Sequence, residues 1–117
     1  MYLSKLSHGM VTLANTQNFN EFELHARAIL GIPVEKICLL KNGASAVVLA
    51  KEDSNSFPVF TGLDKAASIE NTDFKIFSKP STRPYRRMAV ALAYGQDSVE
   101  VLVEKAKNVA THIKLDL

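Results

Sequence analysis

Two segments of the chain show the apolar spacing of amphipathic helices. The first begins at Asn20 and Glu23, which have the spacing of a capping box, and it ends before Gly31. The second begins at Asp97 and Glu100, which have the same spacing. Apolar residues recur at intervals of three and four in both segments, so both are predicted to be helices with one buried face. These predicted faces comprise Phe22, Ala26, Ile29 and Leu30 in the first helix, and Val99, Leu102, Ala106, Val109 and Ile113 in the second.

Between the helices, short runs of β-branched, aliphatic and aromatic residues predict strands. Asn42 and Gly43 form a turn signal that favours a hairpin or tight loop between residues 37–40 and 44–50. The proline within residues 57–60 restricts that strand to a sheet edge or a strand start. Further strands are predicted at 11–13, 74–78, 88–94 and 113–117, and a helical turn at 63–69. The order of helix, strands and helix predicts an α+β fold.

Composition identifies an ordinary globular chain of one-domain size. The 117 residues are 47% hydrophobic and 22% charged. No apolar run approaches the length that spans a bilayer, and the first residues lack a signal-peptide core, so we expect a cytoplasmic protein. The single cysteine, Cys38, excludes an internal disulfide and is predicted to be a buried, unreactive thiol in a strand.

Positive charge is concentrated in one segment of the chain. The net charge is +2, but residues 75–87 carry five cations and no acid, so the rest of the chain carries −3. Two prolines stiffen the loop at residues 79–87, and arginine and lysine are suited to binding phosphate. A solvated basic face is the competing interpretation, and Tyr85 within the loop also allows stacking on a nucleic-acid base.

Other catalytic signatures do not occur in the sequence. His8, His25 and His112 are too far apart, and too isolated from other ligands, for a zinc-site spacing. There is no glycine-rich phosphate loop and no nucleophile elbow. The motifs therefore predict no catalytic residue and no metal ligand.

Several segments in register nevertheless resemble a known family. Residues 9–13, 20–34, 44–49, 77–80 and 86–93 are similar to the formate-dependent phosphoribosylglycinamide formyltransferases of the ATP-grasp superfamily. The resemblance implies a role in de novo purine biosynthesis, in which formate is joined to phosphoribosylglycinamide with ATP and magnesium through formyl phosphate. It also implies that Lys79, Arg86 and Arg87 contact the phosphate of the substrate. Ser7 stands where the family has an aspartate that also touches the substrate.

The two adjacent arginines allow a geometric prediction. Neighbouring side chains on a regular strand point to opposite faces of a sheet. Arg86 and Arg87 can therefore serve one phosphate only where the strand is not yet regular, unless one of them braces the loop instead. We expect Lys79, Arg86 and Arg87 to converge on one anion, and Arg83 to be more exposed and less important.

These observations predict the carboxy-terminal fragment of such an enzyme. Residues 1–34 are expected to be the end of an ATP-grasp domain. Residues 35–117 are expected to form a small β-rich, barrel-sandwich-like domain with one packed helix. ATP and magnesium are expected in the full-length enzyme only, so the isolated chain is predicted to be inactive. The expected partners are the substrate phosphate, the rest of the enzyme and a second copy of the chain, with no membrane.

Three alternatives remain open at this stage. The first is a fragment of the sister carboxyaminoimidazole ribonucleotide synthetase, which shares the architecture and a related ligand. The second is a small nucleic-acid-binding module that uses the basic loop. The third is a structural remnant that only pairs with itself or with a partner.

Overall fold

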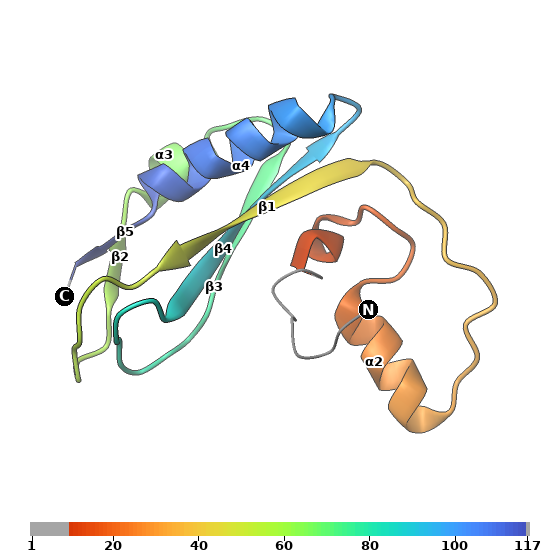
Figure 1. Cartoon of the computed structure of the whole chain (residues 1–117), viewed down its shortest axis with the longest axis horizontal. Helices are drawn as coiled ribbons and strands as arrows, with labels where there is room; N and C mark the ends of the chain where they lie inside the picture. Colours follow the sequence, from red (N-terminus) through yellow and green to blue (C-terminus); the bar gives the residue numbers. More distant parts are fainter. Residues whose placement is uncertain (1–9, 117) are drawn as a thin grey trace.

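The fold combines helices and strands, as the sequence predicts, and the strands form two small β-sheets. The computed structural model describes residues 10–116 (Figure 1). In chain order the elements are η2 (Met10–Ala14), α2 (Glu21–Leu30), β1 (Asn42–Leu49), β2 (Val59–Thr61), α3 (Leu63–Ala67), β3 (Thr72–Ile76), β4 (Arg87–Gly95), α4 (Val99–His112) and β5 (Lys114–Asp116). The strands at 57–60, 74–78, 88–94 and 113–117 and the helical turn at 63–69 are confirmed, with shifted ends.

The strands form two open antiparallel sheets. The larger sheet has the order β1-β4-β3, and the smaller sheet pairs β2 with β5. Helix α4 lies along the larger sheet (Figure 1). Within residues 10–116 the sheets do not close into a barrel, so the barrel-like part of the expected fold is not observed. The mixed α and β architecture with one helix packed on a sheet is confirmed.

The central strand β4 is buried on both faces. Ala89, Ala91 and Ala93 belong to the clusters that also contain the buried residues of α4. The small side chains of these alanines let the helix approach the sheet closely. Val90 and Leu92 point the other way and pack with η2. Because both faces of β4 are buried, its sequence is a continuous apolar run and not an alternation of apolar and polar residues.

The N-cap of α2 is the residue predicted from the sequence, whereas the N-cap of α4 is a different residue. Asn20 Oδ1 accepts a hydrogen bond from the Glu23 N–H at 2.8 Å, and Glu23 Oε1 accepts one from the Asn20 N–H at 3.1 Å. This capping box is the predicted one, and Gly31 ends the helix with φ 70°. In α4 the N-cap is Ser98, whose Oγ accepts from the Val101 N–H at 3.4 Å. The prediction of Asp97 as the cap was wrong by one residue.

The predicted hairpin around Asn42 and Gly43 is wrong. Both residues belong to β1, where they pair with Gly95 and Tyr94 at the far end of β4. A Cβ on Gly43 would overlap Cγ2 of Thr16, so the glycine permits a close approach of two segments rather than a turn. Residues 37–40 form no strand. Their β pairing is limited to an isolated bridge between Leu39 and Gln17.

Two other local predictions are also corrected. Residues 11–13 lie in η2, a 3-10 helix, and not in a strand. The helix is stopped by Asn15, which has φ 58° and whose N–H donates to Thr12 O at 3.1 Å. Cys38 is half-buried and lies outside any strand, where its N–H donates to Asn18 Oδ1 at 2.7 Å. Among residues 10–116, no helix has both the length and the hydropathy needed to cross a membrane.

Candidate functional site

The basic loop between β3 and β4 is fixed by backbone pairing to the segment that follows β1. Thr82 and Ser54 exchange two backbone hydrogen bonds, at 2.8 and 3.1 Å. The buried hydroxyl of Thr82 also donates to Glu52 O at 2.7 Å. These bonds hold the middle of the loop in one position, which reduces the conformational entropy that ligand binding would otherwise remove.

A tight turn then reverses the chain just before β4. The Arg86 N–H donates to Arg83 O at 3.1 Å, with Pro84 and Tyr85 at the two central positions. Tyr85 has φ 65°, so the turn has the type II pattern of proline followed by a left-handed residue. Tyr85 and Arg86 also exchange backbone hydrogen bonds with Ala50, both at 2.8 Å.

The pairing of β1 with β4 is irregular at the paired arginines. Val48 pairs with Ala89, but the next residue, Leu49, pairs with Arg87, so Met88 is an additional residue in the ladder. Such a bulge changes the direction of the side chains beside it. Arg86 and Arg87 were predicted to serve one anion only where the start of the strand is irregular, and the bulge lies at that point.

Arg86 and Arg87 share one open pocket with Lys79. The pocket has a volume of about 380 Å³ and is lined only by residues of the basic loop. The structure therefore brings the three predicted site residues together. It adds Arg83, which is exposed, as is Arg87, whereas Lys79 and Arg86 are half-buried. The complete lining comprises Lys79, Arg83, Pro84, Tyr85, Arg86 and Arg87.

The charge of this pocket is not compensated by acidic side chains. In the part of the chain that the structure describes, none of its four cations forms an ion pair. Burial lowers the pKa of Lys79, and the positive charges of Arg86, Arg83 and Arg87 lower this pKa further. Repulsion of this kind is relieved by a bound anion. The arrangement is therefore suited to binding an anion with several oxygens, such as a phosphate.

Side chains around the pocket restrain two of its cations. Arg86 Nη1 donates to Ser81 Oγ at 3.3 Å. The Lys79 ammonium lies 5.5 Å from the centre of the Phe77 ring. Sequence reasoning did not identify Ser81, because a serine in a polar loop gives no signal of its own. The left-handed conformation of Tyr85 was missed for a similar reason, because glycine or asparagine is the usual residue there.

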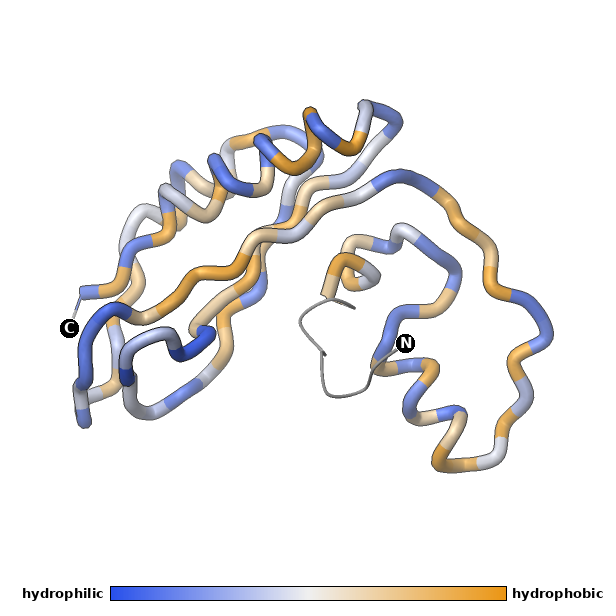
Figure 2. Tube along the Cα trace, viewed as in Figure 1, coloured by the Kyte–Doolittle hydropathy of each residue, from blue (hydrophilic) through white to orange (hydrophobic). Residues whose placement is uncertain are grey.

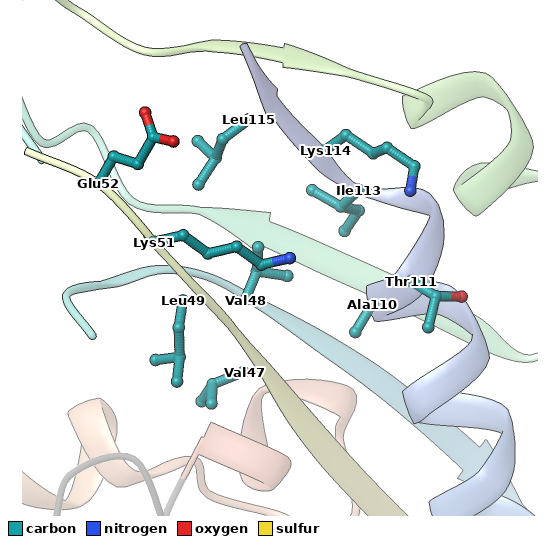
Figure 3. A pocket seen from close by; sticks show the side chains of 10 residues that line it. All are labelled: Val47, Val48, Leu49, Lys51, Glu52, Ala110, Thr111, Ile113, Lys114 and Leu115. Atoms are coloured by element: carbon teal, nitrogen blue, oxygen red, sulfur yellow. The ribbon is translucent and has the colours of Figure 1, made fainter. Parts of the chain in front are cut away.

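A second, larger cavity has a different character. It has a volume of about 610 Å³ and lies between β1 and the segment that joins α4 to β5. Figure 3 shows aliphatic side chains from both sides, together with Lys51, Lys114 and the carboxylate of Glu52. An apolar lining with charges of both signs is less suited to a phosphate than the basic pocket.

The described residues offer no metal centre. No group of three His, Cys, Asp or Glu side chains within residues 10–116 is arranged to hold a metal ion. His25 and His112 lie in α2 and α4 and belong to no such group. Ser7 and His8 lie outside the described residues.

Comparisons with known proteins agree with the resemblance seen in the sequence. A family model described as "PurT, C-terminal" matches residues 43–113. The formate-dependent phosphoribosylglycinamide formyltransferase of Flavobacterium psychrophilum is 50% identical over an alignment of 124 positions that covers 100% of this chain and 32% of that protein. The same enzyme of Chlorobium phaeobacteroides is 52% identical over an alignment of 120 positions that covers 98% of this chain and 31% of that protein.

A solved structure also matches the fold. The crystal structure of N5-carboxyaminoimidazole ribonucleotide synthetase from Thermotoga maritima superposes with a TM-score of 0.80 and 31% identity. It covers 92% of this chain and 29% of that one. The chain thus spans about a third of the length of the relatives it matches.

Proposed function

This chain belongs to the PurT C-terminal family, and from that premise we propose that it holds the phosphate of phosphoribosylglycinamide as the carboxy-terminal part of a formate-dependent formyltransferase. The observation that carries the proposal is the shared pocket of Lys79, Arg86 and Arg87, with its uncompensated positive charge. In purine biosynthesis such an enzyme transfers a one-carbon unit to the glycinamide amine of this phosphorylated substrate.

The pocket would act by positioning the substrate. Lys79 supplies a compact charge, and the arginines supply planar forks that can bind two phosphate oxygens at once. The hydrogen bond from Arg86 to Ser81 restrains the guanidinium before the ligand arrives. With the phosphate held at a fixed point, the distant amine is restricted to a small volume in which formyl transfer can occur.

The residues described in this chain do not fit magnesium. The basic pocket lacks carboxylates, and residues 10–116 contain no group of three metal-ligating side chains. Magnesium in nucleotide sites is bound by carboxylates together with phosphate oxygens. We therefore assign the magnesium implied by the resemblance to no residue within 10–116, and derive no step through it or through ATP.

The division of the chain between two domains is also proposed. The family model begins at residue 43, whereas the curated relatives align with the chain from its start or close to it. In α2, the predicted buried face is exposed, with Ile29 and Leu30 both 70% accessible. Figure 2 shows hydrophobic positions along α2, which lies apart from the two sheets. The radius of gyration is 15.3 Å, compared with about 13 Å for a compact domain of 100 residues. These observations support residues 1–34 as part of an upstream domain and 35–117 as a separate small domain.

A chimera tests this division. The matched segment of the Flavobacterium psychrophilum enzyme is replaced by this chain, and amide hydrogen exchange of peptides from α2 is followed by mass spectrometry. We expect slower exchange of α2 in the chimera than in the 117-residue chain, because the upstream domain would cover the exposed apolar face of this helix. Equal exchange rates of α2 would contradict the proposed division.

A second candidate function is suggested by the structural neighbour. Its 31% identity and TM-score of 0.80 support a common architecture with the ribonucleotide synthetase, but the formyltransferases are 50–52% identical to the chain. Both candidates require a phosphoribosyl ligand, so the basic pocket alone does not distinguish them.

Calorimetry with the 117-residue chain separates the candidates. Phosphoribosylglycinamide, aminoimidazole ribonucleotide and a random oligonucleotide are titrated into the chain and into the Arg87→Ala variant. Lys114→Ala is the matched control, since Lys114 lies outside the basic pocket. Saturable binding of phosphoribosylglycinamide that only Arg87→Ala weakens supports the proposal. Preference for the imidazole ligand would indicate the synthetase, and preference for the oligonucleotide would indicate a nucleic-acid module.

A further inference from the structure

Tyr85 combines an unfavourable backbone conformation with an exposed ring. Its φ of 65° lies in the left-handed region, which is sterically unfavourable for a residue with a bulky side chain. Its side chain is 82% accessible, so burial of the ring does not compensate for the strain. Strained residues with no packing role are found preferentially at ligand sites. The conformation of Tyr85 therefore requires another explanation.

The backbone around Tyr85 is held firmly, although its side chain is free. Its N–H donates to Ala50 O at 2.8 Å, and the turn that contains it is closed by the bond from Arg86 to Arg83. Pro84 precedes it and has a restricted φ. The ring is thus attached to a fixed backbone position at the edge of the basic pocket, which Tyr85 helps to line. Among the described cations, none stacks on this ring.

We propose that Tyr85 contacts the substrate by packing its ring against the ribose of a sugar phosphate whose phosphate is held by Lys79, Arg86 and Arg87. The pocket would then select a phosphorylated sugar over free phosphate. Charge alone does little to distinguish a sugar phosphate from free phosphate, because the cations contact phosphate oxygens in both ligands. An aromatic face beside the anion site supplies apolar contact for the carbon-bound hydrogens of the sugar. The proposal rests on the phosphate site proposed above.

The same features fit a nucleic acid less well than a sugar phosphate. Single-strand binding surfaces use successive aromatic side chains along a basic groove. In the described part of the chain, Tyr85 is the only aromatic residue that lines the basic pocket. One exposed ring in the lining of the pocket matches one sugar phosphate better than a polymer.

Two ligands and three variants test the role of Tyr85. Inorganic phosphate and ribose 5-phosphate are titrated calorimetrically into the 117-residue chain. Tyr85→Asn removes the ring and keeps a residue that tolerates the left-handed conformation, as Asn71 does with φ 55°. Tyr85→Phe keeps the ring and removes only the hydroxyl. Phe57→Asn is the control, because Phe57 is 76% accessible and lies outside the pocket.

The expected result is specific to the sugar. The unaltered chain should bind ribose 5-phosphate more tightly than phosphate, and Tyr85→Asn should weaken only the sugar phosphate, several-fold and up to about tenfold. Tyr85→Phe and Phe57→Asn should retain the preference. The proposed role of Tyr85 is wrong if the unaltered chain binds phosphate without preferring ribose 5-phosphate. It is also wrong if Tyr85→Asn keeps that preference. In both cases the phosphate site is still supported. If neither ligand binds, the phosphate site itself is wrong. If an added oligonucleotide displaces both ligands, the site serves a nucleic acid and the role of Tyr85 in sugar binding is wrong.

Discussion

Arg86 donates a hydrogen bond from Nη1 to Ser81 Oγ over 3.3 Å, which joins the two ends of the basic loop. The guanidinium has four rotatable side-chain torsions between it and the backbone, and this bond restricts their freedom before a ligand binds. A restrained side chain loses less entropy when it binds phosphate. Ser81 is therefore a positioning residue, because it acts on the ligand through Arg86.

Replacement of this hydroxyl should weaken anion binding without unfolding the loop. Ser81→Ala is expected to reduce the affinity for phosphoribosylglycinamide by about 0.5–1.5 kcal/mol, the usual net value of one hydrogen bond. Ser45→Ala, at an exposed position of β1, is the control. Calorimetry measures the affinity, and circular dichroism confirms that the fold is kept. Equal affinities of the two variants would show that Arg86 needs no support from Ser81.

Local signals made part of the fold predictable. The capping box of Asn20 and Glu23 and the left-handed Gly31 are determined within a few residues, so the limits of α2 could be predicted from the sequence. The role of Gly43 could not be predicted from its neighbours in the sequence. Its neighbour Thr16 is distant in sequence, and the close approach of these two residues explains the glycine that was interpreted as a turn.

The site was predictable for a different reason. Lys79, Arg86 and Arg87 could be identified from the resemblance and from the charge of the loop. Ser81 could not, since its bond to Arg86 depends on how the loop folds between them. Nor could the conformation of Tyr85, because the Arg83 to Arg86 turn imposes a backbone angle that the tyrosine itself disfavours.

Glu21 should make stability depend on pH. Only 3% of the residue is accessible, and its carboxylate oxygens have no hydrogen-bond partner among the described residues. Burial raises the pKa of this carboxyl above its ordinary value of 4.5. In the window above 4.5 the folded state therefore binds more protons than the unfolded state, and the free energy of unfolding falls as pH rises.

Glu21→Gln is therefore expected to be more stable than the unaltered chain at pH 7, because a neutral amide is less costly to bury than a charge. The variant should also lose most of the pH dependence above pH 4.5. Urea unfolding at a series of pH values measures both effects. Glu104→Gln is the control, because Glu104 is exposed and forms only a surface pair of 3.8 Å with Lys107. An unchanged pH profile in Glu21→Gln would contradict the assignment.

The loss of the Lys79 proton should make the affinity for anions fall as pH rises. Burial and the three arginines lower the pKa of Lys79 below the ordinary 10.5, so Lys79 loses its proton at a lower pH than it would in water. A bound phosphate favours the protonated form, so affinity should fall as pH rises through this lowered pKa. Calorimetric titrations from pH 7 upward measure the fall. Lys79→Gln should bind more weakly at pH 7 and lack this fall, whereas Lys114→Gln should match the unaltered chain.

The paired arginines provide the strongest test of the phosphate site. In a full-length formyltransferase that carries this chain as its carboxy-terminal part, Arg86→Ala or Arg87→Ala should raise KM for phosphoribosylglycinamide. Loss of one charge-assisted hydrogen bond corresponds to about 1.5–3 kcal/mol, or more than about tenfold. KM for ATP should hardly change, since the basic pocket is assigned to the substrate alone. Arg83→Ala should have a smaller effect than Arg86→Ala, because Arg83 is more exposed than Arg86 and lacks a bond such as the one to Ser81. If both substitutions leave KM for the substrate unchanged, or raise KM for ATP instead, the four cations form a solvated loop and not a phosphate site.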